Sequence, residues 1–269
     1  IAFTGSDRTG QKINEMAAST FKHVTLELGG KSPNIVFEDA DIESAVMGAI
    51  SGIFAATGQT CIAGSRLLLQ RSIHDQFVER LIEVAKTAQI GDPMSTDTHV
   101  GPVTTPPQYQ KILDYIEIAK QDGAKCVLGG QAYTGPAAKG GQFIEPTIFT
   151  DVNNKMRIAQ EEVFGPLLAV IPFDTEEDAI SIGNDVDFGL AAGVWTQDIG
   201  RAIRMSEKLR VGTVWVNTYR AVSFTSPFGG YKRSGIGRES GLEAIKQYMQ
   251  VKSVWIAQQT SPANPFIMR

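Results

Sequence analysis

The residues of this sequence whose types could do chemistry together are Glu27, in LELGGKSPN, and Cys61, in ATGQTCIAGSR. A thiolate attacks electrophilic carbonyls, and a nearby carboxylate can activate the water that releases the covalent product. Glycines beside both residues indicate backbone that approaches a ligand closely. The pair therefore predicts covalent catalysis on a carbonyl compound, with Cys61 as the nucleophile and Glu27 as the general base.

Composition narrows the classes of protein that could carry this pair. The chain has 269 residues, a net charge of −4 and a pI of about 5.5. Its charges are dispersed, so we expect no nucleic-acid partner and no attraction to anionic membranes. No apolar run approaches the roughly 18–20 residues of a membrane-spanning helix. Two cysteines, Cys61 and Cys126, are too few for a disulfide framework, which favours reduced thiols in a cytoplasmic protein.

The histidines do not form a recognisable site. His23, His74 and His99 lie far apart, and none belongs to an HExxH motif or a Cys/His cluster. We therefore expect no transition-metal site. The same distribution argues against a thiol hydrolase, in which a histidine would serve as the base for Cys61.

The elements that must position Glu27 and Cys61 alternate between strand and helix patterns. This alternation predicts an α/β fold with a largely parallel sheet and flanking helices. Helices are predicted over 7–19, 39–56, 72–91 with Ser72 as N-cap and Gly91 as terminator, 107–123, 175–183 with Thr175 as N-cap, and 198–209. Strands are predicted at 1–4, 23–28, 34–37, 66–70, 125–130, 147–152, 167–173, 191–196 and 213–217. Cys126 lies in one of these strands and is interpreted as a buried structural cysteine.

The two ends of the chain have distinct patterns. It opens with IAFTGS, a strand running into a turn with no initiator Met, so we expect the C-terminal part of a longer protein. Residues 218–240 form a long glycine-rich loop without periodicity, which is typical of a functional segment. A short helix over 242–249, a final strand over 251–257 and an unstructured tail are predicted after it.

Six motifs occur in order along this chain: FTGS, LELGGKSPNIV, GQTCIAGSR, EEVFGP, VWVN and SPFGGYKRSGIGRE. Together they resemble the C-terminal half of the NAD(P)-dependent aldehyde dehydrogenase superfamily, from Phe3 to about Ile256. The resemblance implies an aldehyde dehydrogenase-like α/β fold that here lacks most of the N-terminal Rossmann-like domain. It also implies three parts: 1–29 as the end of the dinucleotide-binding domain, 30–240 as the catalytic domain, and 241–269 as a C-terminal helix, oligomerisation strand and tail.

The resemblance assigns a reaction to the two residues singled out first. Cys61 would form a thiohemiacetal with a small-molecule aldehyde, hydride would pass to the nicotinamide, and a thioester would remain. Glu27 would activate the water that hydrolyses the thioester to a carboxylate. Glu239 would help to move protons away from Glu27, although a structural salt bridge is an equal alternative for it.

The resemblance also assigns binding roles. The residues implied at the cofactor, which is NAD or NADP, are Gly5, Ser6, Leu28, Gly29, Gln108, Lys111, Glu162 and Phe164. Gly5 and Ser6 lie at a helix N-terminus, which favours a pyrophosphate anion independently of any family. Thr60, Ile62 and Phe228 would shape the aldehyde pocket.

Several alternatives stay open at the level of the sequence. A CoA-acylating dehydrogenase would pass the thioester to CoA, but the base Glu27 favours hydrolysis. A non-catalytic structural relative need not keep both Cys61 and Glu27. The resemblance further implies a homodimer or homotetramer, in which the strand over 251–257 extends a neighbouring subunit's sheet. The TYRAVSFT segment assigns no particular aldehyde, the residues that separate NAD from NADP lie outside this sequence, and the segment alone is expected to be inactive.

Overall fold

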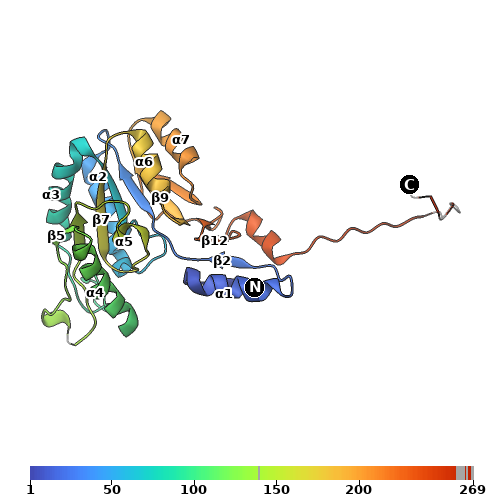
Figure 1. Cartoon of the computed structure of the whole chain (residues 1–269), viewed down its shortest axis with the longest axis horizontal. Helices are drawn as coiled ribbons and strands as arrows, with labels where there is room; N and C mark the ends of the chain where they lie inside the picture. The colour runs from blue at the N-terminus through green and yellow to red at the C-terminus, as the bar shows by residue number, and fades with distance from the viewer. Residues whose placement is uncertain (139, 259–263, 265, 268–269) are drawn as a thin grey trace.

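The computed structural model of the chain describes residues 1–138, 140–258, 264 and 266–267. Most of the predicted tail therefore lies outside the described residues. The described residues form two main sheets and one two-stranded sheet with their helices, followed by a C-terminal arm that extends away from them (Figure 1).

The larger sheet has seven strands in the order β10-β9-β3-β4-β7-β6-β5. Its strands are β3 (Pro33–Val36), β4 (Arg66–Gln70), β5 (Lys125–Leu128), β6 (Thr147–Thr150), β7 (Leu167–Phe173), β9 (Ala191–Trp195) and β10 (Thr213–Val216). All neighbouring pairs are parallel except β5 with β6, which is antiparallel. The predicted α/β fold with a largely parallel sheet is confirmed.

Helices cover both faces of this sheet. One face carries α2 (Ile42–Phe54) and α3 (His74–Ala85), and the other carries α4 (Pro106–Gln121), α5 (Arg157–Gln160), α6 (Glu176–Asn184) and α7 (Ile199–Lys208). Strand β4 shows why the apolar run LLL is needed. Leu67 and Leu69 pack under α2 and α3, whereas Leu68 packs under the other layer. Because side chains alternate along a strand, a strand covered on both faces must be apolar throughout.

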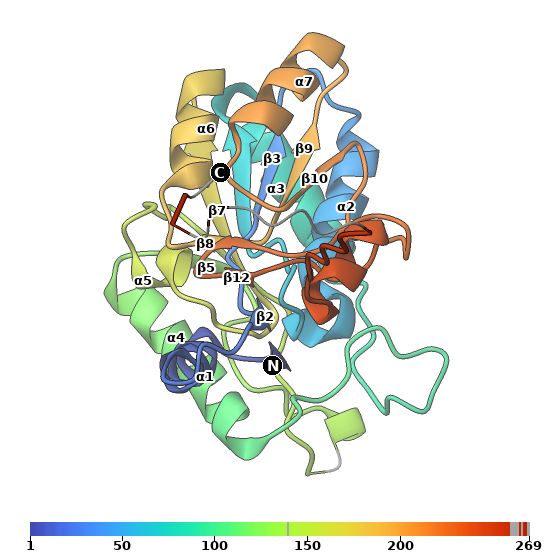
Figure 2. The same ribbon diagram turned by 90° about the vertical axis from the view of Figure 1, so that its right-hand side faces the viewer.

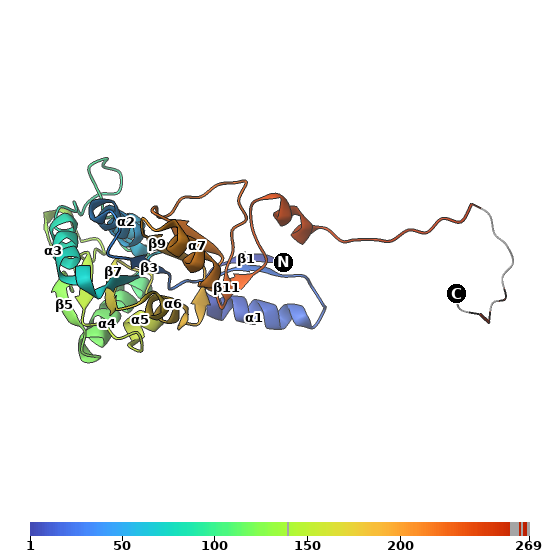
Figure 3. The same cartoon turned by 90° about the horizontal axis from the view of Figure 1, so that it is seen from above.

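The smaller sheet has the strand order β1-β2-β12, and its central strand ends at Glu27. It consists of β1 (Ala2–Thr4), β2 (Thr25–Glu27) and β12 (Gly235–Ile236), and α1 (Asp7–Ala18) packs against it. Figures 1 and 3 show this sheet and α1 beside the larger sheet, away from β5. Strand β12 pairs antiparallel with β2, with Gly235 opposite Glu27. A separate two-stranded antiparallel sheet consists of β8 (Phe188–Gly189) and β11 (Tyr231–Lys232).

Some local predictions are wrong. Helix α3 begins at His74, because the Ser72 hydroxyl donates to Glu38 (2.7 Å) instead of capping and residues 71–73 form a 3₁₀ turn. The helix ends at Ala85, so Gly91 does not terminate it. The 218–240 loop contains β11 and β12, and the last predicted helix is a 3₁₀ segment, η4 (Leu242–Tyr248). The N-cap at Thr175 is confirmed, with a reciprocal capping box to Asp178.

Two further segments differ in degree from expectation. Cys126 is only partly buried, and its thiol donates to the Leu128 carbonyl (3.3 Å). Residues 251–257 are exposed and pair with no strand in the described part of this chain. The role of that segment between subunits stays a prediction.

A buried arginine ties the centre of the fold to two loops and to the end of α6. Arg66, the first residue of β4, is fully buried. Its guanidinium donates to the carbonyls of Lys31 (3.0 Å), Ile182 (2.9 Å) and Gly183 (2.9 Å) and to Asn154 Oδ1 (3.0 Å). Arg66 thereby fixes the chain just after the Glu27 strand and satisfies carbonyls in the last turn of α6.

We predict that Arg66→Met lowers the thermal unfolding midpoint sharply, because it leaves buried carbonyls unpaired at a cost of about 3 kcal/mol or more. Arg71→Met is the matched control: Arg71 forms an exposed ion pair with Asp174, and its loss should leave the midpoint near that of the wild type. Equal midpoints for the two variants would contradict the clamp. Calorimetry or circular dichroism makes the measurement.

Candidate active site

Glu27 lies at the end of β2 with its carboxylate enclosed by protein. The side chain is 6% exposed, and neither carboxylate oxygen has a hydrogen-bond partner in the described part of the chain. Burial, and then the nearby charge of Glu239, raises the pKa of Glu27 to about 8, against a smaller opposing effect of Arg238. The carboxylate rests against Gly229, where a Cβ would lie 2.7 Å from Oε1. An unpaired buried carboxylate with a pKa near neutrality is suited to accept a proton.

Cys61 follows α2 on a strained turn. Ala56, Thr57 and Gly58 all have left-handed backbone, with φ of 51°, 58° and 68°. For non-glycine residues this costs on the order of 1 kcal/mol or more each, so neighbouring contacts must hold the turn. The Thr57 hydroxyl donates to the Gly101 carbonyl (3.1 Å).

The residue two before the nucleophile carries most of the remaining support. Gln59 Nε2 donates to the Pro102 carbonyl (3.3 Å), and its Oε1 accepts from the backbone N–H (3.0 Å) and the hydroxyl (2.9 Å) of Thr104. The segment before α4 thus fixes the turn that presents Cys61.

The surroundings of Cys61 disfavour its thiolate form. Burial, then Glu162, and more weakly Glu27, raise the pKa of Cys61. Gly30 lies directly against this residue, because a Cβ at Gly30 would be 2.4 Å from the Cys61 carbonyl oxygen. The peptide after β2 and the nucleophile turn are therefore in van der Waals contact.

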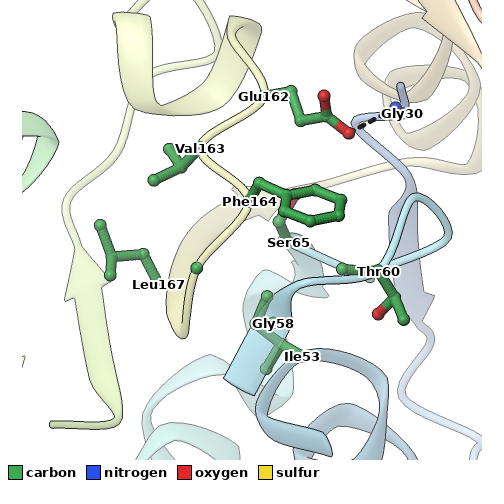
Figure 4. A pocket seen from close by; sticks show the side chains of 11 residues that line it. Gly30, Ile53, Gly58, Thr60, Ser65, Glu162, Val163, Phe164 and Leu167 are labelled. Atoms are coloured by element: carbon green, nitrogen blue, oxygen red, sulfur yellow. Dashed lines mark hydrogen bonds between the residues drawn. The ribbon is translucent and has the colours of Figure 1, made fainter. Parts of the chain in front are cut away.

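Glu162 and Phe164 project from the turn that follows α5. The Glu162 Oε1 atom accepts from the Gly30 N–H (3.0 Å), as Figure 4 shows, with the Phe164 ring between this carboxylate and the segment of Thr60. A Cβ at Gly29 would lie 2.4 Å from Glu162 Oε2, so a larger residue there would have to displace the carboxylate. Phe164 has left-handed backbone (φ 62°), which turns its ring toward the site.

Helix α4 holds this turn in place. Gln108 Nε2 donates to the Val163 (2.7 Å) and Phe164 (2.9 Å) carbonyls, and Lys111 Nζ donates to the Glu162 carbonyl (2.8 Å). Both residues are predicted at the cofactor. In this structure they hold the backbone of Glu162 and Phe164, and their direct contact with a cofactor stays a prediction.

Three other predicted cofactor residues lie at the junction of the small sheet and α1. Ser6 caps α1 by accepting from the Thr9 N–H (3.3 Å), and the Gly5 N–H donates to the Glu27 carbonyl (3.0 Å). Leu28 packs its side chain under α1 at Gly10, where a Cβ would lie 2.6 Å from it. The helix N-terminus predicted for an anion is thus linked to the Glu27 strand by one backbone hydrogen bond.

A cavity of about 610 Å³ opens at Cys61. It is lined by all three residues predicted for the aldehyde pocket, Thr60, Ile62 and Phe228, together with Trp215, Phe224 and neighbouring small residues. No lysine, arginine, aspartate or glutamate lines the part of it that the described residues form. The lining favours an uncharged or weakly polar group next to the nucleophile.

Glu239 enters the site through backbone pairing. Its N–H and carbonyl both bond with Phe228 (2.7 Å each), which brings the end of the 218–240 loop back onto the pocket. Its charge raises the pKa of Glu27. This places Glu239 in electrostatic range of the proposed base.

Sequence reasoning missed several residues of this site. Lys31 is almost fully buried, and burial, followed by Arg66, lowers its pKa to about 7. Trp215 lines the cavity, and Gly229 leaves room for the Glu27 carboxylate. All three lie inside quoted motifs, GGKS, VWVN and SPFGG, so position within a motif was the available signal.

Neither a metal cluster nor a membrane-spanning helix is found in the described residues. Among residues 1–138, 140–258, 264 and 266–267, no group of three or more His, Cys, Asp or Glu is arranged to hold a metal ion. In the same residues, no helix has the length and apolar character that crossing a membrane requires.

Comparison with known proteins identifies the family that this fold and site define. The model of the aldehyde dehydrogenase family matches residues 1–254. The chain therefore belongs to the aldehyde dehydrogenase family.

Individual relatives agree with this membership. The chain is 49% identical over 256 residues to a betaine aldehyde dehydrogenase of Mesorhizobium japonicum, covering 95% of this chain and 53% of that protein. It is 51% identical over 255 residues to an aldehyde dehydrogenase of Aspergillus niger, covering 94% and 50%. The chain thus spans about half the length of the curated relatives it matches.

Solved structures superpose closely on this one. Betaine aldehyde dehydrogenase of Staphylococcus aureus in complex with NAD⁺ aligns with a TM-score of 0.90 and 45% identity, covering 92% of this chain and 49% of that one. The NAD⁺ complex of aldehyde dehydrogenase from Bacillus cereus aligns with a TM-score of 0.92 and 46% identity, covering 96% and 52%.

The electrostatics of Cys61 generate a test. Glu162→Gln keeps the acceptor for the Gly30 N–H but removes the charge that raises the Cys61 pKa, so the thiolate fraction should increase. We expect faster alkylation of Cys61 by iodoacetamide at pH 8, measured in a Cys126→Ala background. Glu161→Gln is the control, since Glu161 pairs with Arg157 instead. Unchanged alkylation in the Glu162 variant would contradict the coupling.

Proposed function

We propose that the protein containing this chain oxidises an aldehyde to a carboxylate, with NAD or NADP as the hydride acceptor. The observation that carries the proposal is a buried carboxylate without protein partners, Glu27, in electrostatic range of the free thiol Cys61 at the mouth of a largely apolar cavity. Family membership and the NAD⁺ complexes of two solved relatives support it.

The residues present fit a nicotinamide cofactor. Within the described residues, Glu162 Oε1 accepts a hydrogen bond from the Gly30 N–H, which leaves Oε2 free to accept ribose hydroxyls. Gly29 and Gly30 keep that side of the carboxylate clear of side chains. Ser6 at the α1 N-terminus would accommodate the pyrophosphate, with Phe164 packed beside the ring. When bound, the oxidised cofactor supplies the hydride acceptor that converts a thiohemiacetal into a thioester.

The side chains of this chain supply the remaining steps. The Cys61 sulfur bonds to the aldehyde carbon as the carbonyl π bond breaks, and the thiol proton passes through water to the former carbonyl oxygen, which forms the thiohemiacetal. After oxidation, Glu27 accepts a proton from water, whose oxygen attacks the thioester and expels the Cys61 thiolate as the carboxylate product forms. The proton on Glu27 then leaves by way of Glu239 and solvent. Because Glu27 is poised to activate water, hydrolysis is favoured over transfer to CoA.

Several wider features belong to the same proposal. The proposed aldehyde carries no charge near its carbonyl, because the cavity wall that the described residues form is built from apolar, aromatic and small polar side chains beside Cys61. The division at residues 29 and 240 and a homodimer or homotetramer joined through residues 251–257 follow from the family resemblance. A cytoplasmic location follows from the small number of cysteines. Residues 1–269 alone are proposed to be inactive.

The first test concerns the two thiols. Cys61→Ala in the full-length protein should reduce aldehyde-dependent NAD(P)H formation by at least about a thousandfold, because the covalent route is lost. Cys126→Ala, which removes the other free thiol, should stay near the wild-type rate. Spectrophotometry at 340 nm across a panel of aldehydes measures both and identifies the preferred substrate. Normal turnover by the Cys61 variant would refute the mechanism.

The second test concerns the pH dependence of the base. Glu27 must be ionised to activate water, so deacylation should rise with pH through about 8. Glu27→Gln should abolish this rise and slow steady turnover, leaving a burst of NAD(P)H. Glu239→Gln removes a charge that raises the Glu27 pKa, so its profile should shift to lower pH. Pre-steady-state kinetics at several pH values decide; an unaltered profile in both variants would exclude Glu27.

The same group predicts a stability effect of defined sign. The Glu27 pKa is about 8 in the folded chain and near 4.5 when unfolded. Its contribution to stability is therefore present below pH 4.5 and is lost as pH rises toward 8. Glu27→Gln should raise the unfolding midpoint relative to wild type by an amount that grows between these pH values.

A further inference from the structure

Tyr219, in the long loop after β10, occupies a slot built from glycines. Its ring and hydroxyl lie where side chains of Gly52, Gly64 and Gly193 would otherwise project. A Cβ at these positions would approach Tyr219 to 3.2, 2.9 and 2.6 Å respectively. The three glycines come from α2, from the segment after Cys61 and from β9, so three separate parts of the chain make room for one ring.

The hydroxyl at the end of this slot reaches the nucleophile segment. Tyr219 Oη donates to the carbonyl of Ile62 at 2.9 Å. Ile62 is the residue directly after Cys61 and lines the same cavity. The hydrogen bond therefore acts on the Ile62–Ala63 peptide, after Cys61, whereas the Gln59 contacts act before it.

The other neighbours of Tyr219 connect it to the substrate pocket. Its ring lies 4.8 Å from the ring of Trp215, which lines the cavity. The Trp215 indole donates to the Ala221 carbonyl (2.7 Å) and so closes the loop around Tyr219. Asn217 and Arg220 on either side have left-handed backbone, with φ of 52° and 65°. These features fix the direction of the ring before any ligand binds.

We infer that Tyr219 is a positioning residue for the nucleophile: its hydroxyl holds the Ile62–Ala63 peptide, one residue past Cys61, and so keeps the segment of Cys61 in register with the wall of the aldehyde pocket. This inference rests on the proposed function of Cys61. A small displacement of reacting atoms costs a large part of the rate. Loss of the hydroxyl should therefore lower kcat while the cofactor site, which lies on other elements, keeps its KM.

Tyr219→Phe in the full-length protein is the direct test, because it removes the hydroxyl and keeps the ring in its slot. We expect kcat to fall roughly 10- to 100-fold with the KM for NAD(P) within twofold of wild type. Since the freed segment opens, iodoacetamide should alkylate Cys61 faster, by about threefold or more at the high-pH plateau. Tyr133→Phe, at a partly buried tyrosine after β5, is the control and should change none of these values.

A double-mutant cycle locates the effect. Gly64→Ala places a methyl group 2.9 Å from the Tyr219 hydroxyl and should itself reduce kcat. In the Tyr219→Phe background the same change should cost less, because the atom it displaces is gone. Strictly additive losses would overturn the inference.

The remaining outcomes are equally decisive. Cys61 alkylation at the wild-type rate overturns the inference whatever happens to kcat, and kcat within twofold of wild type overturns it as well. A lower unfolding midpoint with unchanged kcat and alkylation would show a purely packing role. If Cys61→Ala keeps full turnover, the proposed function itself fails, and the alkylation assay, which needs no turnover, still reports on Tyr219.

Discussion

The arrangement of the candidate site depends on two glycines, Gly29 and Gly30, in the segment that connects β2 of the smaller sheet with β3 of the larger sheet. Gly29 and Gly30 leave β2 and are pressed on one side by the Glu162 carboxylate and on the other by the Cys61 carbonyl. Any side chain would separate these groups by the width of a methyl group or more. Because the Gly30 N–H also donates to Glu162, one dipeptide sets the spacing between Glu27, Cys61 and Glu162.

Burial and neighbouring carboxylates raise the pKa values of Glu27 and Cys61. Glu27 and Cys61 are both held above their ordinary pKa by burial, and each is affected further by a neighbouring carboxylate, Glu239 for the first and Glu162 for the second. Such an arrangement costs folding stability and is held by contacts elsewhere, notably the Arg66 hydrogen bonds. Both shifts favour the protonated form, so each group must give up its proton before it can act as nucleophile or base.

Much of the fold was predictable because the sequence signals are local. The apolar run at Leu67–Leu69 and the capping box at Thr175 each specify their element through neighbouring residues. The prediction at Ser72 failed because a distant partner, Glu38, takes its hydroxyl. Strands β11 and β12 could not be recognised in a glycine-rich loop, since their partners lie about 40 and 200 residues away in the chain and their pairing follows from tertiary contact.

The sequence by itself determined the chemistry: one thiol, one carboxylate, glycines beside both, and six ordered motifs that identify the family. Residue types and the order of motifs can be read from the sequence alone, and the intrinsic reactivity of a thiol or a carboxylate is a property of the functional group. Tertiary structure decided which groups meet. The raised pKa of Glu27, the support of the Glu162 turn by Gln108 and Lys111, and the glycine slot for Tyr219 all arise from contacts between residues far apart in the chain. Burial and close approach are properties of the packed chain, so no local pattern encodes them.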